Sequence, residues 1–132
     1  MFDLFKKKQS GPKYLFYVID DEEKVLDTLA TLIEMTFPCK VKKFTTLESA
    51  VDSLGKETLA PDLIFSDIKM GRESGLSIRD RLKEMGANIP VLFITGLAGE
   101  EGFHNGYWSI NKPVSAASLK KYTNTLLNQA KR

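Results

Sequence analysis

"LIFSDIKMGRESG", residues 63–75, is an apolar run that stops on a carboxylate and continues into turn residues. Leu63, Ile64 and Phe65 favour burial, whereas Asp67 stands where a buried strand should meet water. Aspartate is also a common turn former, so a strand can end in this way without any functional reason. The residues that follow the other apolar runs decide between these two interpretations.

The rest of the chain alternates between predicted strands and predicted helices. Short apolar runs occupy residues 14–20 and 91–95, residues 39–46 alternate like an edge strand, and residues 106–110 are a weaker fifth candidate. Apolar residues at helical spacing fill 25–37, 47–54, 78–85 and 119–127, and Thr45 with Glu48 predicts a capping box for the second helix. This order predicts an α/β fold with a doubly wound, five-stranded parallel sheet.

Length and composition exclude several classes of protein. The chain has 132 residues and a net charge of +2, which is too small to predict direct binding to nucleic acid. No apolar stretch reaches the length of a membrane span. The single cysteine, Cys39, excludes an internal disulfide framework and fits a reducing compartment, so a cytoplasmic location is expected.

The first residues differ in character from the rest. Residues 1–13, MFDLFKKKQSGPK, lack the order of a signal peptide, because their apolar patch is short and precedes the lysines. We expect them to form a tail before a single domain at 14–130. A weak anchor on a partner or an acidic membrane surface is the alternative for this tail.

Polar residues follow four of the predicted strands, and a parallel sheet brings them to one edge. Each has a plain structural interpretation: a helix start, a strand end or a solvated lysine. Together they are harder to dismiss, because two carboxylates about 4 Å apart repel by about 4 kcal/mol at an effective dielectric of about 20. The residues at this edge are Asp20, Asp21, Asp67, Thr95, Gly96, Lys112 and Pro113.

The chemistry of this edge favours a cation and a phosphoryl group. Carboxylate oxygens are ligands that Mg²⁺ prefers, and the ion is usually held by one or two carboxylates together with a phosphate. A carboxylate beside Mg²⁺ and a lysine can attack phosphorus to form an aspartyl phosphate. Lys112 and the Thr95 hydroxyl would bind phosphoryl oxygens, and Gly96 would leave room for that group.

The segments VIDDEE, LIFSDIKMGRESGL, VLFITG and NKP, in this order, resemble the receiver domain of two-component response regulators. The resemblance implies a flavodoxin-like strand order of 2-1-3-4-5 and a signalling domain that catalyses only its own phosphorylation and dephosphorylation. It makes Asp67 the phospho-acceptor and assigns Mg²⁺ to Asp20, Asp21, Asp67 and the Lys69 backbone carbonyl. It assigns the phosphate contacts to Thr95, Gly96 and Lys112, and structural roles to Gly75 and to Pro113, which would follow a cis peptide bond.

The resemblance also implies partners. The phosphoryl donor would be a sensor histidine kinase or a phosphotransfer protein, a downstream protein would read the switched surface, and a weak homodimer is possible. No direct contact with nucleic acid is expected.

Two features depart from this family. Residues 96–111 contain four glycines and no apolar stripe, so the fourth helix is expected to be short or absent. Ser109 stands three residues before Lys112, where the family commonly has a switch tyrosine or phenylalanine. A phosphorylation-independent interaction domain therefore remains the alternative function.

Two other functions are disfavoured. A haloacid-dehalogenase-like phosphatase would need an Asp-x-Asp pair on the first strand, but Asp20 is followed by Glu22. A flavin phosphate would be repelled by the four acids at 20–23.

Overall fold

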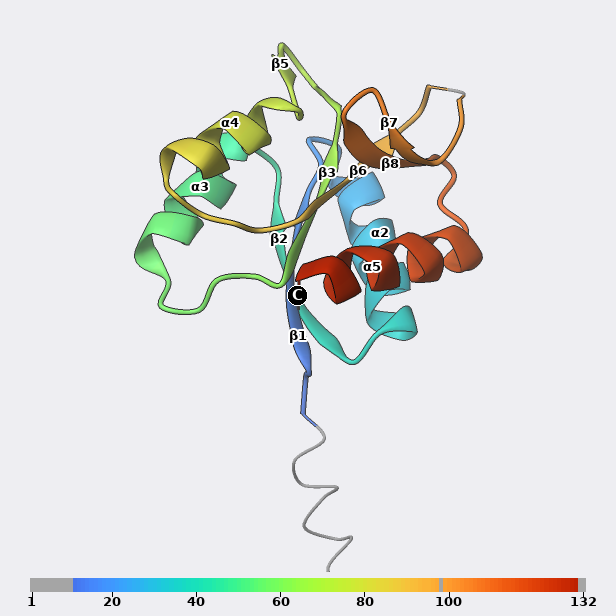
Figure 1. The fold of residues 1–132 in the computed structure, drawn as a ribbon, viewed down its shortest axis with the longest axis horizontal. Helices are drawn as coiled ribbons and strands as arrows, with labels where there is room; N and C mark the ends of the chain where they lie inside the picture. Colours follow the sequence, from blue (N-terminus) through green and yellow to red (C-terminus); the bar gives the residue numbers. More distant parts are fainter. Residues whose placement is uncertain (1–10, 98, 131–132) are drawn as a thin grey trace, which may run out of the picture.

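The computed structural model describes residues 11–97 and 99–130 of the chain. A six-stranded sheet runs through its centre, and helices cover both faces (Figure 1). The strands of this sheet are β1 (Tyr14–Ile19), β2 (Cys39–Phe44), β3 (Leu63–Asp67), β6 (Val91–Thr95), β7 (Gly102–His104) and β8 (Tyr107–Asn111). The helices are α2 (Glu23–Thr36), α3 (Leu47–Lys56), α4 (Ser77–Glu84) and α5 (Ala116–Ala130). A two-stranded hairpin, β4 (Lys69–Met70) with β5 (Glu73–Ser74), follows β3.

The predicted sheet order is confirmed, with one strand added. The sheet has the order β2-β1-β3-β6-β8-β7, and its first five strands pair in parallel. They correspond to the predicted order 2-1-3-4-5. The sixth strand, β7, pairs antiparallel with β8 and was not predicted, because its three residues carry no strand pattern of their own.

Each face of the sheet has its own apolar core. On one face α2 and α5 pack against alternate residues of the strands, with Ile33 and Leu119 fully buried. On the other face α3 and α4 contribute Leu47 and Ile78 to a second core. Because both faces of β1, β3 and β6 are covered, these strands read as continuous apolar runs.

Two local predictions need correction. The N-cap of α3 is Thr46, whose side chain accepts a hydrogen bond from the Ser49 backbone N–H, so the predicted capping box at Thr45 and Glu48 is wrong. The cap forms one residue later because Thr46 has the extended backbone that an N-cap requires. Residues 1–10 of the predicted tail lie outside the described residues.

A β-hairpin replaces the fourth helix of the expected pattern. Among residues 96–97 and 99–111, which the structure describes, there is no helix. Asn105 and Gly106 connect β7 to β8 with positive φ angles of 57° and 85°, the backbone of a tight two-residue hairpin turn. The expectation of a short or absent fourth helix is thus confirmed.

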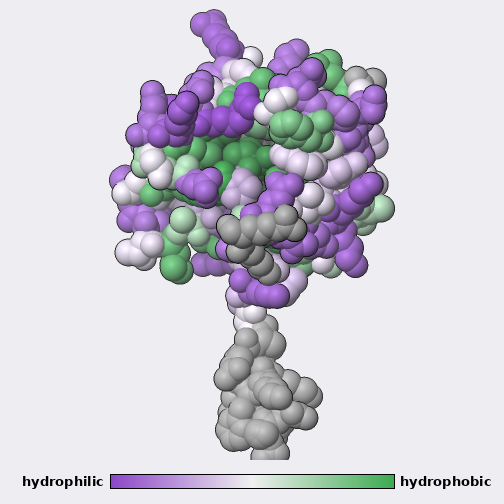
Figure 2. All heavy atoms as spheres, in the orientation of Figure 1, coloured by the Kyte–Doolittle hydropathy of each residue, from purple (hydrophilic) through white to green (hydrophobic). Residues whose placement is uncertain are grey.

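The missing helix leaves a groove between α4 and the hairpin. Figure 2 shows an apolar patch on this side of the molecule. The groove has a volume of about 460 Å³, and its lining includes Val91, Phe93 and Tyr107. Arg79 of α4 partly covers this face, since its guanidinium lies 5.9 Å from the Phe93 ring and 5.6 Å from the Tyr107 ring. Its Nη1 also donates to the Gly106 carbonyl at 2.9 Å.

Candidate functional site

Two adjacent strands bring the predicted carboxylates together. Asp20 follows β1, Asp67 ends β3, and these strands pair in parallel at the point where the strand order reverses. Asp20 is fully buried and Asp67 is 7% exposed, whereas Asp21 is exposed. Burying a carboxylate is costly unless it is paired, so this placement calls for a nearby cation.

Lys112 is that cation. Its Nζ lies 3.2 Å from Asp20 Oδ2 and 3.1 Å from Asp67 Oδ2, and so bridges the two buried carboxylates. The Lys112 backbone N–H donates to the Thr95 carbonyl at 2.7 Å, which fixes the start of this segment to the end of β6. The Lys112–Pro113 peptide bond is cis, as the resemblance implied.

The site shifts the pKa of two of its members. Burial raises the pKa of Asp20, although the Glu22 backbone N–H and Lys112 both act against this shift. Burial alone would lower the pKa of Lys112, but the hydrogen bond to Asp67 and the attraction of Asp20 outweigh it and raise the pKa. Lys112 is therefore protonated at neutral pH. Of Asp20 and Lys112, Asp20 is the group whose charged form is disfavoured by its surroundings.

Three carboxylates are arranged as a possible metal site. Asp20, Asp21 and Asp67 each offer an oxygen, and these three atoms lie within 4.8 Å of one another. A single lysine facing three carboxylates leaves negative charge uncompensated, and hard oxygen donors suit Mg²⁺. The donor set therefore fits the predicted ion. The Lys69 carbonyl, at the start of β4, stays a predicted ligand.

Gly75 lets the chain pass close to Asp67. A Cβ at this position would lie 1.7 Å from the Asp67 carbonyl oxygen, which no other residue type could tolerate. The Gly75 N–H also donates to the Ile68 carbonyl at 2.5 Å. The structural role that the resemblance implied for Gly75 thus has a clear physical cause, which is the close approach of two backbone segments.

Thr95 and Gly96 lie at the end of the neighbouring strand. Thr95 is 9% exposed, and its Oγ1 accepts the Leu97 backbone N–H at 3.1 Å. A Cβ on Gly96 would meet nothing within 4 Å, so this position borders open space. A pocket of about 360 Å³ adjoins Thr95, and Ser109 and Asn111 are also among its lining residues.

Glu101 is a residue near the site that sequence analysis did not single out. Its carboxylate accepts hydrogen bonds from the Asn111 backbone N–H at 2.8 Å and from the Ser118 hydroxyl at 2.5 Å. No local sequence pattern points to these contacts, because they depend on the hairpin. The hairpin itself had a signal, the Asn105–Gly106 pair, which is a typical two-residue turn.

The geometry defines a class of protein: a flavodoxin-like α/β domain with a lysine-bridged acidic cluster at the carboxyl edge of its parallel strands. Residues 16–124 match the family described as the response regulator receiver domain, and the chain belongs to that family. The resemblance seen in the sequence is therefore confirmed.

Curated relatives extend beyond this chain. It is 29% identical over 93 residues to the response regulator protein TmoT of Ectopseudomonas mendocina, covering 70% of this chain and 41% of TmoT. It is 33% identical over 79 residues to the sensory transduction protein LytT of Bacillus subtilis (strain 168), covering 59% of this chain and 32% of LytT. The chain thus spans less than half the length of these relatives.

Solved structures support the fold. A response regulator receiver domain protein from Clostridium thermocellum superposes with a TM-score of 0.73 at 23% identity, covering 89% of this chain and 97% of that one. At this identity the likeness concerns the fold alone. Among the residues that the structure describes, none of the helices has the length and apolar character needed to cross a membrane.

Proposed function

We propose that this chain is a phospho-accepting receiver domain, with Asp67 as the acceptor. The observation that carries the proposal is the Lys112 ammonium, held 3.1 Å from Asp67 Oδ2 and 3.2 Å from Asp20 Oδ2 at the end of the central strands. An ammonium here neutralises charge that builds up on a phosphoryl group as it moves to Asp67.

The proposed donor is a phosphohistidine of a sensor kinase or a phosphotransfer protein. An Asp67 oxygen attacks phosphorus and forms the P–O bond of an aspartyl phosphate. The P–N bond breaks, and its electron pair stays with the departing imidazole. Lys112 and the Thr95 hydroxyl are the proposed contacts of the transferred oxygens, and Gly96 leaves space beside them.

The proposed metal ligands are Asp20, Asp21 and Asp67 with the Lys69 carbonyl. When bound, Mg²⁺ would offset the negative charge that the three carboxylates and the phosphoryl group bring together. Asp20 would contribute most to this affinity, since it is a fully buried carboxylate whose charge burial disfavours. The metal would thus relieve the charge repulsion that Lys112 only partly balances.

The wider setting is also part of the proposal. Residues 14–130 would form the receiver domain, preceded by a tail at 1–13, and would act in the cytoplasm. A downstream protein would read the phosphorylated state.

A phosphorylation-independent interaction domain is the second candidate. Two observations favour it: a hairpin stands where the fourth helix of the expected pattern would be, and Ser109 stands where the resemblance leads us to expect an aromatic switch residue. The retained cluster of Asp20, Asp67 and Lys112 favours the first candidate instead, because buried charges are costly to keep without a use.

One experiment separates the two. Intact-protein mass spectrometry after incubation with Mg²⁺ and acetyl phosphate should show one added phosphoryl group in the wild type and none in Asp67→Asn. Asp62→Asn is the matched control, since Asp62 is a carboxylate at the opposite end of the same strand and should leave phosphorylation unchanged. If the wild type gains no mass and also fails to bind beryllofluoride with Mg²⁺, the second candidate replaces the first.

A further inference from the structure

We infer that Glu101 is a positioning residue that couples the Lys112 end of the acidic site to helix α5. The inference rests on the proposed function and adds to it a route by which the site reaches another surface. Its basis is a single carboxylate that joins two elements. Glu101 Oε2 accepts the Asn111 backbone N–H at 2.8 Å, and Oε1 accepts the Ser118 hydroxyl at 2.5 Å.

The first contact lies next to the proposed phosphate ligand. Asn111 is the last residue of β8 and directly precedes Lys112. Its side-chain Nδ2 donates to the Gly99 carbonyl at 2.7 Å, so the 99–101 segment holds Asn111 through both backbone and side chain. Asn111 also pairs with Thr95 across the sheet. A movement of Thr95 or Lys112 toward a phosphoryl group therefore acts on the Asn111–Glu101 bond.

The second contact lies in the first turn of α5. This turn has no acidic residue of its own, so Glu101 supplies the negative charge that a helix N-terminus favours. Ser118 is followed by Leu119, which is fully buried in the core beneath α5. A shift of the Glu101 carboxylate therefore acts on a turn that is packed against the sheet.

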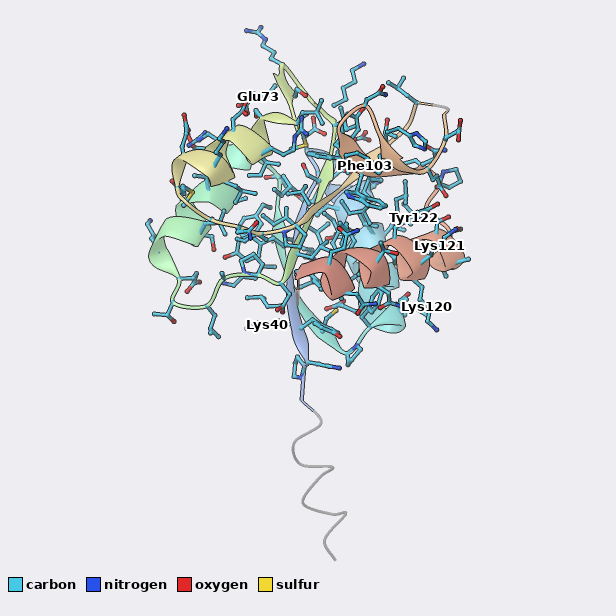
Figure 3. The ribbon with its side chains drawn as sticks, viewed as in Figure 1. Lys40, Glu73, Phe103, Lys120, Lys121 and Tyr122 are labelled. Carbon is cyan, nitrogen blue, oxygen red and sulfur yellow. The ribbon has the colours of Figure 1, made fainter. Side chains whose placement is uncertain are left out.

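The hairpin reinforces the same connection. A Cβ on Gly102 would lie 3.4 Å from the Tyr122 ring, so β7 runs close against α5. Phe103, Trp108 and Tyr122 continue the contact, with ring centroids 5.4 Å and 6.3 Å apart along the series. Figure 3 shows Phe103 and Tyr122 on the same side of the molecule, on β7 and α5.

The small side chain of Ser109 bears on the role of the hydrogen bonds from Asn111 through Glu101 to Ser118. Ser109 is 6% exposed and lines the pocket beside Thr95. Because serine has no aromatic ring, this position cannot respond to the site by the movement of a ring. Glu101 reaches from the same pocket region to α5 through hydrogen bonds. The polar part of the coupling therefore runs through the Glu101 carboxylate, beside the ring contacts of the hairpin with α5.

The test measures hydrogen exchange at residues 115–120, with and without Mg²⁺ and beryllofluoride, together with the beryllofluoride affinity. In the wild type, ligand should change exchange at the start of α5 by about fivefold, an ordinary size for coupling between sites. Glu101→Ala and Ser118→Ala should both abolish this response. Ser118→Ala should leave the affinity unchanged, whereas Glu101→Ala should weaken it about fivefold, as the loss of one hydrogen bond implies.

Two further variants make the test specific. Glu101→Gln should restore the response, because its amide can accept from Asn111 and donate to the Ser118 oxygen. Glu100→Ala is the matched control, because Glu100 is the neighbouring residue and its side chain is 88% exposed. This variant should behave like the wild type. If Glu101→Ala fails to fold, the result of Ser118→Ala is sufficient, because this variant removes only the hydrogen bond between Glu101 and α5.

The remaining outcomes are decisive in different ways. If the wild type binds beryllofluoride but α5 does not respond, or if Glu101→Ala and Ser118→Ala respond like the wild type, the coupling is wrong and the proposed function stands. If the wild type does not bind beryllofluoride at all, both proposals fall.

Discussion

Two segments meet at the same edge of the sheet and are held in different ways. Residues 63–75, the acceptor segment, contain β3 and the proposed acceptor Asp67 and are fixed by the central strands and by a backbone contact at Gly75. Residues 96–111 contain the β7–β8 hairpin. Its strand β8 pairs with β6 in the sheet, whereas β7 and the residues before it are held by β8, by the turn and by single side chains, Arg79 and Glu101. The comparison indicates that the acceptor segment tolerates little change, whereas the hairpin segment should respond to substitution in small, separate steps.

The largest expected effect is in the acceptor segment, at Gly75. Gly75→Ala places a Cβ 1.7 Å from the Asp67 carbonyl oxygen, and a backbone atom cannot move aside cheaply. We expect a loss of about 3 kcal/mol or more in the free energy of unfolding, the upper range for overpacking. Urea denaturation measures this loss.

A second glycine provides the control for Gly75→Ala. A Cβ on Gly55, in the last turn of α3, meets nothing within 4 Å. Gly55→Ala should therefore leave stability unchanged or raise it by about 0.5 kcal/mol, because alanine favours a helix. Equal effects of the two substitutions would contradict the view that the acceptor segment is held by a close backbone contact.

The next effect concerns the buried charge at Asp20. The pKa of this carboxyl is raised, chiefly by burial, so the folded protein binds its proton more tightly than the unfolded chain does. The stabilisation that comes from this tighter proton binding is fully present below pH 3.8. It is lost as the pH rises through the raised pKa of the folded protein. Asp20→Asn removes this loss, while Asp67 still pairs with Lys112, so it should raise the free energy of unfolding of the metal-free protein at neutral pH.

Thermal unfolding in EDTA across the acidic range measures this effect. The advantage of Asp20→Asn should shrink as the pH falls through the raised pKa of the folded wild type, where its carboxyl becomes neutral, and should be gone below pH 3.8. Added Mg²⁺ should stabilise the wild type more than the variant. Asp21→Asn is the matched control: Asp21 is exposed, so its replacement should change the metal-free stability by less than about 0.5 kcal/mol. A destabilised Asp20→Asn in EDTA would show that Asp20 supports Lys112 more than it strains the site.

The difference between the two segments also explains what the sequence could predict. Asp20, Asp67, Thr95 and Lys112 follow apolar runs directly, and a parallel sheet places all strand ends at one edge. The meeting of these residues could therefore be predicted from the order of the apolar runs, whereas the strand order was predicted from the resemblance to receiver domains. Their close distances followed from the same topology.

Within the hairpin segment, only β8 could be predicted in the same way, from the weaker strand candidate at 106–110. The contacts of this segment come from residues far apart in the chain: Arg79 of α4 covers Tyr107, and Ser118 of α5 holds Glu101. Such pairs leave no periodic pattern in the sequence. The Asn105–Gly106 turn did leave a local signal, but four glycines in this stretch favoured an irregular loop over a strand pair.

Arg79 tests how much one side chain supports the hairpin. Arg79→Ala removes a guanidinium from the rings of Phe93 and Tyr107 and a hydrogen bond to the Gly106 carbonyl. Because Arg79 is exposed, we expect a loss of only about 1 kcal/mol in the free energy of unfolding. Arg81→Ala on the same helix breaks an exposed ion pair with Glu48 and should cost less than Arg79→Ala does. If the two losses are equal, the hairpin does not depend on Arg79.

The smallest effect is expected at the hairpin turn. Asn105 has a φ of 57°, which asparagine adopts more readily than alanine, so Asn105→Ala should cost roughly 0.5 kcal/mol. Asn105→Gly meets the same backbone requirement and should be close to neutral, which separates backbone strain from loss of the side chain. Both are measured by urea denaturation together with phosphorylation of Asp67. Since the turn precedes β8, at the strand end away from Lys112, neither variant should alter phosphorylation. A variant that lost phosphorylation while staying folded would show that the two segments act as one unit, and would overturn the distinction between them.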